Sequence, residues 1–409
     1  MGRRIQSPAC DRHWLKLRSV CEKGIRLFIL SGLGLATAAG WGAPPPGVVI
    51  THSPIWTLKY IGSPSLEVLP NSHYIATHDF FGPGSAEKEE GITRVFLSTD
   101  RGLTWRQQSE IHGAFWSSVF THRGALYLMG PDKADGNIVI RRSKDEGRTW
   151  TIPQDENSGQ LFPGKYGAAP TPTVEHAGRL WRTVSNRLLS APVEADLLRA
   201  TNWTISDSPQ SDRHWLGGHF EDWGEGNVVI APNRNVVNVM KVRYLVPGED
   251  KAAVIAFNPE GTKALPFSES DFVSMPGARI KFTVRHDPVS HLYCALTSYL
   301  LPEDYGPNTS LRRNTIALVT SPDLRTWTMR RVLLHDPDVQ YHGFQYLDWA
   351  IEGDDLIALS RTAWPDGLGG PVRQHDANYL TFHRFKNFRV ALGEVMEGTG
   401  GKATKPGAD

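Results

Sequence analysis

Short apolar runs separated by turn residues make up most of the chain. The clearest runs are residues 66–69, 94–97, 125–128, 137–140, 227–230 and 356–359, all rich in β-branched, leucine or aromatic side chains. Runs of this kind, bounded by Gly, Pro, Asn and Asp, are typical of β-strands joined by tight turns. Segments with the period of a helix are nearly absent. The pattern therefore predicts an all-β protein.

One turn signal recurs six times, each time between two strand-like runs. These turns lie at residues 69–73, 121–124, 175–178, 231–235, 286–290 and 352–355. They are roughly 50 to 65 residues apart, a period that suits four strands and their connecting turns. We therefore predict a six-bladed β-propeller with a four-stranded antiparallel sheet in each blade; a seven-bladed propeller is the alternative.

A second motif marks another turn of the repeats. It spans Ser98–Trp105 and Ser143–Trp150, and it returns without its glycine at Ser321–Trp327. This is the Asp-box, in which the Asp side chain accepts hydrogen bonds from turn amides and the Trp packs the next strand onto its sheet. Because the turn occupies these carboxylates, we expect a structural role for Asp100, Trp105, Asp145, Trp150, Asp323 and Trp327.

The N-terminal residues 1–43 have the pattern of an export signal. Arginine and lysine side chains are frequent up to Arg26, and a short apolar stretch, residues 27–35, then ends in small residues. The stretch is shorter than the roughly 20 residues of a membrane-spanning helix, which is the alternative. We predict a secreted or periplasmic protein whose propeller covers residues 44–393, with residues 47–58 closing the ring in the last blade and a disordered tail at 394–409.

Composition excludes several classes of partner. The chain has 44 basic and 43 acidic residues, a net charge of +1, so no strong field attracts nucleic acid or a membrane surface. Thirteen Trp residues offer stacking surface for a carbohydrate partner. Removal of the leader would take Cys10 and Cys21 away and leave Cys294 alone, so a monomer without disulfides is expected.

Motifs for cofactors and metals are absent from the sequence. It contains no phosphate-binding glycine loop, no nucleophile elbow and no zinc-ligand spacing. A calcium ion held by loop carboxylates such as Asp366 is the one alternative, and the spacing of the acidic residues does not support it. We therefore expect no cofactor and no metal.

In a propeller, the starts of the innermost strands and the ends of the following strands open on one face. The inner-strand starts would contribute Trp116, Tyr166, Glu221, Asp222, Glu225, Arg279, Lys281, His342 and Gln345. The second-strand ends would contribute His78, Asp79, Asn186, Arg187, Lys241, Arg243, Arg361 and Thr362. Nearly every repeat thus directs a cation, an acid or an aromatic ring at one mouth, where a ligand is expected.

Several of these residues have a candidate chemical role. His78, beside a glycine-bounded loop, and His375, after a glycine-rich loop, are candidate general acids or bases; a strand-capping histidine is the alternative for His78. Guanidinium groups bind carboxylates through two hydrogen bonds, so an acidic sugar could be bound by several arginines, although surface salt bridges are the alternative for each. The expected substrate contacts are Trp116, Arg187, Arg279, Lys281, His342 and Arg361.

The three Asp-boxes, with worn copies at residues 196–203, 258–261 and 386–387 that complete the six repeats, resemble those of the sialidase (neuraminidase) superfamily, over roughly residues 47–388. The resemblance implies a propeller, a substrate with an acidic sugar, and a tyrosine assisted by a carboxylate, for which Tyr166 and Glu225 are the candidates. Sialidases begin their first inner strand with an arginine that binds the sugar carboxylate. The corresponding position here is Gly62, so the chain departs from the sialidase pattern there.

A second set of segments resembles secreted bacterial sialidase-like proteins and the propeller enzymes that cleave rhamnosyl-glucuronate linkages. These segments are residues 78–82, 342–349, 360–363 and 375–378. Together the two resemblances imply an exo-acting glycoside hydrolase for an acidic glycan that contains uronic or sialic acid. The alternatives are a polysaccharide lyase, in which Arg187 or Arg361 neutralises a uronate while His78 or Tyr166 abstracts its proton, and a non-catalytic propeller that binds a glycan or protein.

Overall fold

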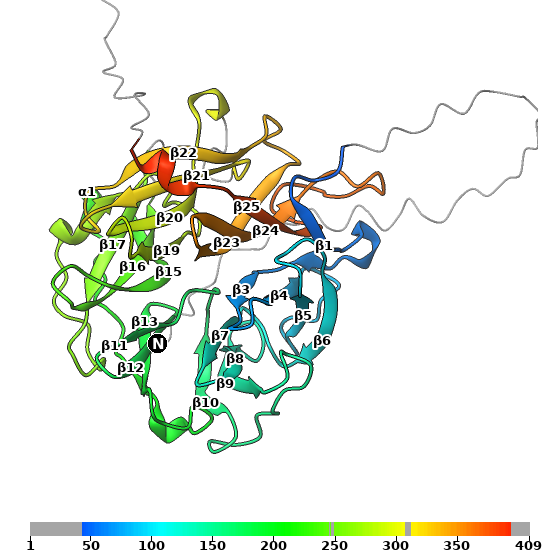
Figure 1. The fold of residues 1–409 in the computed structure, drawn as a ribbon. Coiled ribbons are helices and arrows are strands. Elements are labelled where there is room, and N and C mark those ends of the chain that lie inside the picture. The colour runs from blue at the N-terminus through cyan, green and yellow to red at the C-terminus, as the bar shows by residue number, and fades with distance from the viewer. Residues whose placement is uncertain (1–42, 245, 247–248, 307–311, 394–409) are drawn as a thin grey trace, which may run out of the picture. The chain divides into compact units, whose positions relative to one another are not determined.

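The protein is described by a computed structural model that covers residues 43–244, 246, 249–306 and 312–393. All of these residues belong to one compact unit. They form six antiparallel sheets that follow one another around a common centre, with little helix (Figure 1). This arrangement is a β-propeller, and its six sheets agree with the six repeats of the sequence. The predicted disordered tail and all but the last residue of the predicted leader lie outside the described residues.

The strands follow the hairpin pattern of the sequence. The first sheet contains β2 (Tyr60–Ile61), β3 (Ser65–Val68), β4 (Tyr74–Phe81), β5 (Ile92–Ser98) and β6 (Arg106–His112). The second contains β7 (Ser118–His122), β8 (Ala125–Pro131), β9 (Gly136–Ser143) and β10 (Gln160–Tyr166). The third contains β11 (Val174–His176), β12 (Arg179–Val184), β13 (Arg187–Pro192) and β14 (Thr204–Ile205).

The remaining sheets continue the series after a short helical turn, α1 (Trp215–Gly218). The fourth sheet contains β15 (Phe220–Ile230), β16 (Val236–Tyr244), β17 (Lys251–Ala256) and β18 (Phe272–Ser274). The fifth contains β19 (Thr283–Asp287), β20 (Leu292–Ser298), β21 (Thr315–Ser321) and β22 (Thr328–His335). The last contains β23 (Gly343–Glu352), β24 (Asp355–Ala363), β25 (Tyr379–Phe385) and β1 (Val48–His52).

The N-terminal strand closes the ring. Strand β1 pairs antiparallel with β25, with Val48 opposite Phe382 and His52 opposite Tyr379. The first and last parts of the propeller therefore share one sheet, as residues 47–58 were predicted to do. This pairing makes the ring difficult to open, because separating the first and last sheets would break both a sheet and a core.

Hydrophobic packing joins each sheet to its neighbours. The buried apolar side chains form six clusters, one between each pair of adjacent sheets. The cluster that closes the ring, for example, packs Ile61 and Leu66 of the first sheet against Ile357 and Leu380 of the last. Alternating side chains of each strand thus supply two different cores, one on each face of the sheet.

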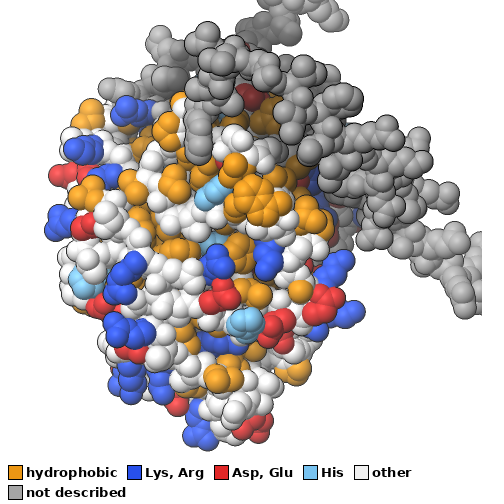
Figure 2. All heavy atoms as spheres, turned by 90° about the vertical axis from the view of Figure 1, so that its right-hand side faces the viewer, with side chains coloured by type: hydrophobic (Ala, Val, Ile, Leu, Met, Phe, Trp, Pro, Cys, Tyr) orange, Lys and Arg blue, Asp and Glu red, His pale blue; other side chains and the backbone are white. Residues whose placement is uncertain are grey.

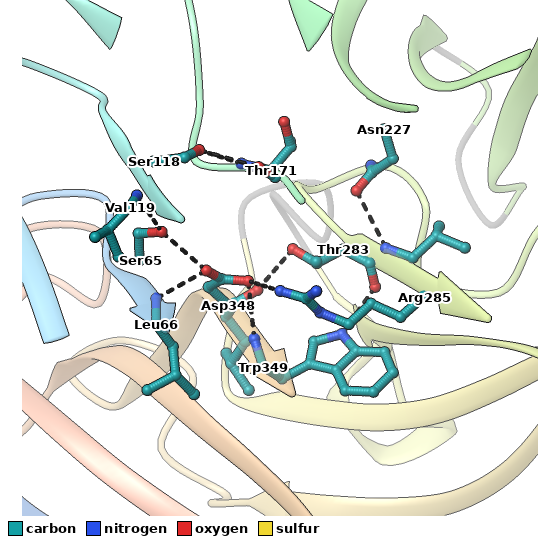
Figure 3. Close-up of polar contacts among 12 residues, drawn as sticks. Ser65, Leu66, Ser118, Val119, Thr171, Asn227, Thr283, Arg285, Asp348 and Trp349 are labelled. Carbon is teal, nitrogen blue, oxygen red and sulfur yellow. Dashed lines mark hydrogen bonds and ion pairs between the residues drawn. The ribbon is translucent and has the colours of Figure 1, made fainter. Parts of the chain in front are cut away.

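Short polar side chains near the centre of the ring join neighbouring sheets. We call this set the polar belt, and it consists of Ser65, Ser118, Thr171, Thr183, Asn227, Thr283 and Asp348. Figure 3 shows most of its links. The Val119 N–H donates to Ser65 Oγ at 3.1 Å, and the Thr283 hydroxyl donates to the Leu347 carbonyl at 2.8 Å. Each link satisfies a buried polar group by a hydrogen bond to the next sheet.

Asp348 completes the polar belt between the last sheet and the first. Its Oδ2 accepts hydrogen bonds from Ser65 Oγ at 3.0 Å and from the Leu66 N–H at 2.9 Å. Its Oδ1 accepts hydrogen bonds from Arg285 at 3.1 Å and from the Trp349 N–H at 3.0 Å (Figure 3). One carboxylate therefore ties together β3, β19 and β23.

The Asp-box turns have the hydrogen bonds that their sequence suggests. Asp100 Oδ1 accepts from the Thr104 N–H at 2.9 Å, and Trp105 Nε1 donates to the Gly102 carbonyl at 3.1 Å. The hydrogen bonds from Thr104 lower the Asp100 pKa to about 2. Asp145 and Trp150 repeat the arrangement. Asp323 and Trp327 make the corresponding hydrogen bonds in the turn that lacks the glycine, where Leu324 has a φ of 65°.

The surface carries charges of both signs in close alternation. On the face shown in Figure 2, basic and acidic side chains lie interspersed, as the near-zero net charge suggests. Cys294 is free and buried. No helix within the described ranges has the length and apolar character needed to cross a membrane.

Replacing Asp348 tests the polar belt. Asp348→Ala leaves Arg285 and the Leu66 N–H without their buried partner, so we expect a loss of about 3 kcal/mol or more in unfolding free energy. The control is Asp354→Ala, since Asp354 also pairs with an arginine but its side chain is 79% exposed. Urea and thermal unfolding measure both variants. Equal stability of the two variants would contradict a structural role for the belt.

Candidate active site

A cavity of about 410 Å³ opens where the inner strands begin. Its wall contains Phe81 at the end of β4, Trp116 just before β7, Ser185 just after β12, Glu225 of β15 and Arg361 of β24. The cavity thus draws on five of the six sheets, at the face where sequence analysis placed the mouth. A pocket that several rigid elements build together is the usual location of a ligand site.

A tyrosine and a glutamate meet inside this cavity. The Tyr346 hydroxyl donates to Glu225 Oε1 at 3.3 Å, and both residues line the wall. The regular pairing of β23 with β24 shifts between Gln345 and Asp348, and Tyr346 adopts a φ of 55°. A non-glycine residue in the left-handed region costs free energy, and such residues are frequent at functional sites. The backbone irregularity turns the Tyr346 ring toward Glu225.

Neighbouring charges keep Glu225 ionised and Tyr346 protonated. Burial alone would raise the Glu225 pKa, but the ammonium groups of Lys241 and Lys281 outweigh it and lower the pKa. Lys241 Nζ lies 3.4 Å from Glu225 Oε2. The negative charge of Glu225 in turn raises the Tyr346 pKa. The pair therefore consists of a phenol and a carboxylate ready to accept its proton.

Arg361 forms the side of the cavity next to Tyr346. Its guanidinium lies 4.4 Å from the centre of the Phe81 ring and 4.8 Å from that of Tyr346, and its Nη2 donates to the His375 carbonyl at 2.8 Å. Burial lowers the Arg361 pKa to about 10, so the group is still charged at neutral pH. Its Nε has no hydrogen-bond partner among the described residues. A ligand in the cavity could accept from this buried donor.

Arg243 is a second cation in the cavity wall. It lies near the end of β16, opposite Asp222 of β15 and two residues beyond Lys241. Because β16 runs toward the mouth, Arg243 is about 6.5 Å nearer to the rim than Lys241. Its side chain makes no hydrogen bond or ion pair with any described residue. It is therefore free to bind an anionic group.

Three further groups at the cavity can bind or transfer protons. Glu87 uses Oε2 to accept from the Gly82 N–H at 2.8 Å and from Ser85 Oγ at 3.0 Å, which leaves Oε1 open. Asp135 lies in the same wall. His375 Nδ1 contacts Asp376 Oδ1 at 2.8 Å, and burial lowers the His375 pKa to about 4, so this imidazole is neutral at pH 7.

A buried carboxyl group occupies the space beside Gly62. A Cβ atom at Gly62 would lie 1.5 Å from Asp79 Oδ1, so no side chain fits there while Asp79 keeps its position. Asp79 accepts hydrogen bonds from the backbone N–H groups of Ser63, at 2.8 Å, and Trp116. Burial raises its pKa to about 7. The glycine at position 62 thus leaves room for an acidic group behind the cavity wall.

Five of the residues that the sequence predicted for the site line the cavity: Trp116, Glu225, Arg243, Arg361 and His375. The others do not. Arg187 Nε donates to Ser208 Oγ at 3.0 Å, and Arg279 pairs with Asp250 at 3.3 Å. His342 pairs with Asp336 and stacks on Trp364, with 3.9 Å between ring centres. Lys281 is 3% exposed and lies behind the wall, below Tyr346.

The predicted positions of His78 and Tyr166 are wrong. His78 is fully buried between the sheets, where its ring stacks on Phe96 and contacts Phe80, and burial lowers its pKa to about 4. Successive side chains of a strand point to opposite faces, so Asp79 faces the cavity wall and His78 faces the core. Tyr166 ends β10, the outer strand of its sheet, and packs against the apolar cluster between the second and third sheets.

Tyr346 and Glu87 line the cavity but were not predicted from the sequence. Gln345 was expected at the mouth, and strict alternation would have turned the next residue away from it. The register shift in β23 reverses this expectation. Glu87 lies in the loop between β4 and β5, where no strand pattern fixes the direction of a side chain. The one available signal was that Tyr346 belongs to the segment 342–349 that carried the second resemblance.

Comparison with solved structures identifies the fold. An α-L-arabinofuranosidase of Fusarium graminearum in complex with an iminosugar is 13% identical, with 86% of this chain and 99% of that chain covered and a TM-score of 0.54. The Hadza microbial sialidase is 15% identical, with 84% and 69% covered and a TM-score of 0.54. A Dyadobacter fermentans protein of unknown function is 14% identical, with 84% and 100% covered and a TM-score of 0.54.

The chain has the sialidase-like β-propeller fold. At these identities the likeness shows the fold alone, and the chemistry must be argued from the cavity itself. No protein-family model and no curated protein matches the chain.

Adding a methyl group at Gly62 tests the position of Asp79. Gly62→Ala forces the buried carboxyl group to move, so we expect a loss of about 1–3 kcal/mol in unfolding free energy. Gly167→Ala is the matched control, because Gly167 also lines the cavity but its nearest neighbour, Ser185 Oγ, would lie 3.9 Å from the new Cβ. Thermal unfolding compares them. Part of the loss should return in Gly62→Ala/Asp79→Ala, and no recovery would contradict the steric account.

Proposed function

We propose that this protein is an exo-acting, retaining glycoside hydrolase for an acidic glycan, with Tyr346 as its nucleophile. The observation that carries the proposal is the contact between the Tyr346 hydroxyl and Glu225 inside the cavity. A protonated tyrosine beside an ionised carboxylate is the arrangement that an activated nucleophile requires. Tyrosine nucleophiles of this kind are known among sialidases.

The first half of the reaction forms a bond between the enzyme and the sugar. The Tyr346 oxygen attacks the anomeric carbon while its proton passes to Glu225 and the glycosidic C–O bond breaks. The leaving oxygen must receive a proton at the same time. Glu87 suits this role, since it lines the cavity and only one of its carboxyl oxygens, Oε2, accepts hydrogen bonds from described residues, those of Gly82 and Ser85.

The second half returns the enzyme to its starting state. A water molecule attacks the anomeric carbon, Glu87 accepts a proton from this water, and the bond between the carbon and the Tyr346 oxygen breaks. Glu225 then returns its proton to Tyr346. Two inversions at one carbon give net retention of configuration.

The cations of the cavity support an acidic substrate. Arg361 has an unpartnered Nε beside Tyr346, and Arg243 has no partner at all among the described residues. A carboxylate on the substrate would supply the missing acceptors. The proposed export of the chain rests on the sequence of residues 1–43 and would bring the cavity into contact with extracellular glycans.

The cavity favours this proposal over the two alternatives. A binding propeller does not need an ion pair between Lys241 and Glu225 next to a buried phenol, because keeping these charges partly buried costs free energy without improving sugar stacking. A lyase needs a base that removes a proton next to a uronate. The two bases that the sequence offered for this reaction, His78 and Tyr166, do not line the cavity.

Removing the nucleophile tests the proposed reaction. Tyr346→Phe should lower kcat by a factor of about 100 or more, because the attacking oxygen is lost while the ring remains. Glu225→Gln should have an effect of similar size, since the amide cannot accept the proton. The control is Tyr341→Phe, because the side chain of Tyr341 lies on the surface and bonds only Gln340.

Release of sugar from uronate-bearing and sialylated glycans measures these variants, and the anomeric configuration of the first product is read by NMR. Retention is expected. Full activity of Tyr346→Phe would refute the proposed nucleophile. An unsaturated uronate among the products would instead identify a lyase.

Charge recognition can be tested separately at the rim. Arg243→Ala should raise KM for a uronate-bearing glycan about 10-fold or more, because a charge-assisted hydrogen bond is lost. The same variant should leave KM for the corresponding neutral glycoside within about 2-fold. Arg187→Ala is the matched control, since Arg187 is also a strand-end arginine but contacts Ser208 outside the cavity. An equal rise in KM for both substrates would argue against a carboxylate at Arg243.

A further inference from the structure

Lys281 is a buried cation without an ion-pair partner. It lies just before β19, its side chain is 3% exposed, and no carboxylate oxygen of a described residue comes within 4.0 Å of it. Lysine is almost never fully buried unless it is paired. Other groups near Lys281 must therefore stabilise its buried ammonium.

The contacts of Lys281 lead to the backbone next to Tyr346. Its Nζ donates to Thr283 Oγ1 at 3.0 Å, and this hydroxyl donates in turn to the Leu347 carbonyl at 2.8 Å. The same Nζ lies 5.9 Å from the centre of the Tyr346 ring. The ammonium group is thus joined through the polar belt to the residue that follows Tyr346, and it also lies near the ring itself.

Two carboxylates attract this ammonium from a greater distance. Burial lowers the Lys281 pKa to about 8, while Asp348 and Glu225 oppose this effect and Arg285 adds to it. Lys281 therefore interacts electrostatically with the carboxylate of the polar belt and with the carboxylate of the candidate active site. Its positive charge offsets both, at a place where no solvent can do so.

We propose that Lys281 is a positioning residue, which fixes Tyr346 through Thr283 and balances the negative charge of the Tyr346–Glu225 pair during catalysis. This inference rests on the proposed function. When the bond between the sugar and the Tyr346 oxygen breaks, negative charge develops on that oxygen before the proton returns from Glu225. A fixed cation behind the ring stabilises this charge without needing to reorganise.

The role predicts a limit to activity at high pH. Above pH 8 the Lys281 ammonium loses its proton, and the cluster then loses a positive charge. The other charged or titratable groups that face it come from every adjacent element: Glu225 of β15, Lys241 of β16, Arg285 of β19, Arg313 before β21, Tyr346 and Asp348 of β23, and Arg361 of β24. An arginine at position 281 would keep its charge through this range.

The experiment compares Lys281→Met, Lys281→Arg and a matched control. Methionine has a similar length and removes a buried unpaired charge, so Lys281→Met should fold with an unchanged or higher Tm. The control is Lys251→Met, because Lys251 Nζ makes the same kind of contact, 3.0 Å to Ser274 Oγ, in the outer part of the fourth sheet.

Kinetics and pH profiles give the decisive readouts. Lys281→Met should lower kcat about 10- to 100-fold while KM stays within about 2-fold, because an interaction with the transition state is lost. Lys281→Arg should keep more of the activity and move the alkaline limb of the kcat profile up by at least about one pH unit. Lys251→Met should change neither quantity. A kcat for Lys281→Met equal to that of the control would overturn the proposal.

A titration without substrate tests directly whether the charges of Lys281 and Glu225 interact. NMR of protein labelled at the lysine ε-carbons follows the Lys281 signal, which is assigned by its loss in Lys281→Met. Glu225→Gln should lower the midpoint of this signal, since a nearby negative charge is removed. An unchanged midpoint would overturn the proposed charge balance.

The two proposals fail in different ways. Activity that is lost in Tyr346→Phe but intact in Lys281→Met overturns the role of Lys281 alone. Equal activity of the wild type and Tyr346→Phe overturns the proposed function, and the positioning role falls with it.

Discussion

Closure of the ring by the polar belt is the constraint on which the rest of the structure depends. Short polar side chains near the centre link each sheet to the next, and Asp348 joins the last sheet to the first (Figure 3). Apolar packing between sheets is strong but has no direction, so it tolerates sliding of one sheet past another. Buried hydrogen bonds are directional, and leaving a buried polar group without a partner costs free energy. They therefore fix the position of each sheet relative to its neighbour along the strands.

The same belt sets the geometry of the candidate active site. Tyr346 lies two residues before Asp348 on one strand, and Glu225 lies two residues before Asn227 on another. Because both belt residues are fixed, the Tyr346 hydroxyl and Glu225 are brought within 3.3 Å of each other from distant parts of the chain. Thr283 contributes twice, since it bonds Leu347 and also holds Lys281. The hydrogen bonds of the polar belt thus both stabilise the fold and position the residues of the candidate active site.

Acidic and basic side chains alternate in the candidate active site, next to the polar belt. Cations lie on both sides of Glu225, which keeps this carboxylate ionised, and the carboxylate keeps the neighbouring phenol protonated. Elsewhere in the wall, Asp79 occupies the space next to Gly62, and Arg361 lies over the rings of Phe81 and Tyr346. Position 62 must therefore be a glycine while Asp79 keeps this place in the structure.

The sequence by itself determined the strands, their hairpin turns and the number of repeats. These features depend on local physics: alternation of apolar residues, glycines at turns, and an Asp that bonds the amides a few residues away. The sequence also indicated the face of the site and five of its residues, Trp116, Glu225, Arg243, Arg361 and His375. It could do so because strand starts and strand ends follow from the repeat.

Only the tertiary structure decided which side chains meet. His78 and Asp79 are adjacent in sequence, yet one enters the core between sheets and the other the cavity wall, since a one-residue choice of face cannot be read without the register. Tyr346 reaches Glu225 through a register shift that no residue pattern reveals. Local sequence specifies strands and turns, whereas register and the burial of charges depend on contacts between residues far apart in the chain.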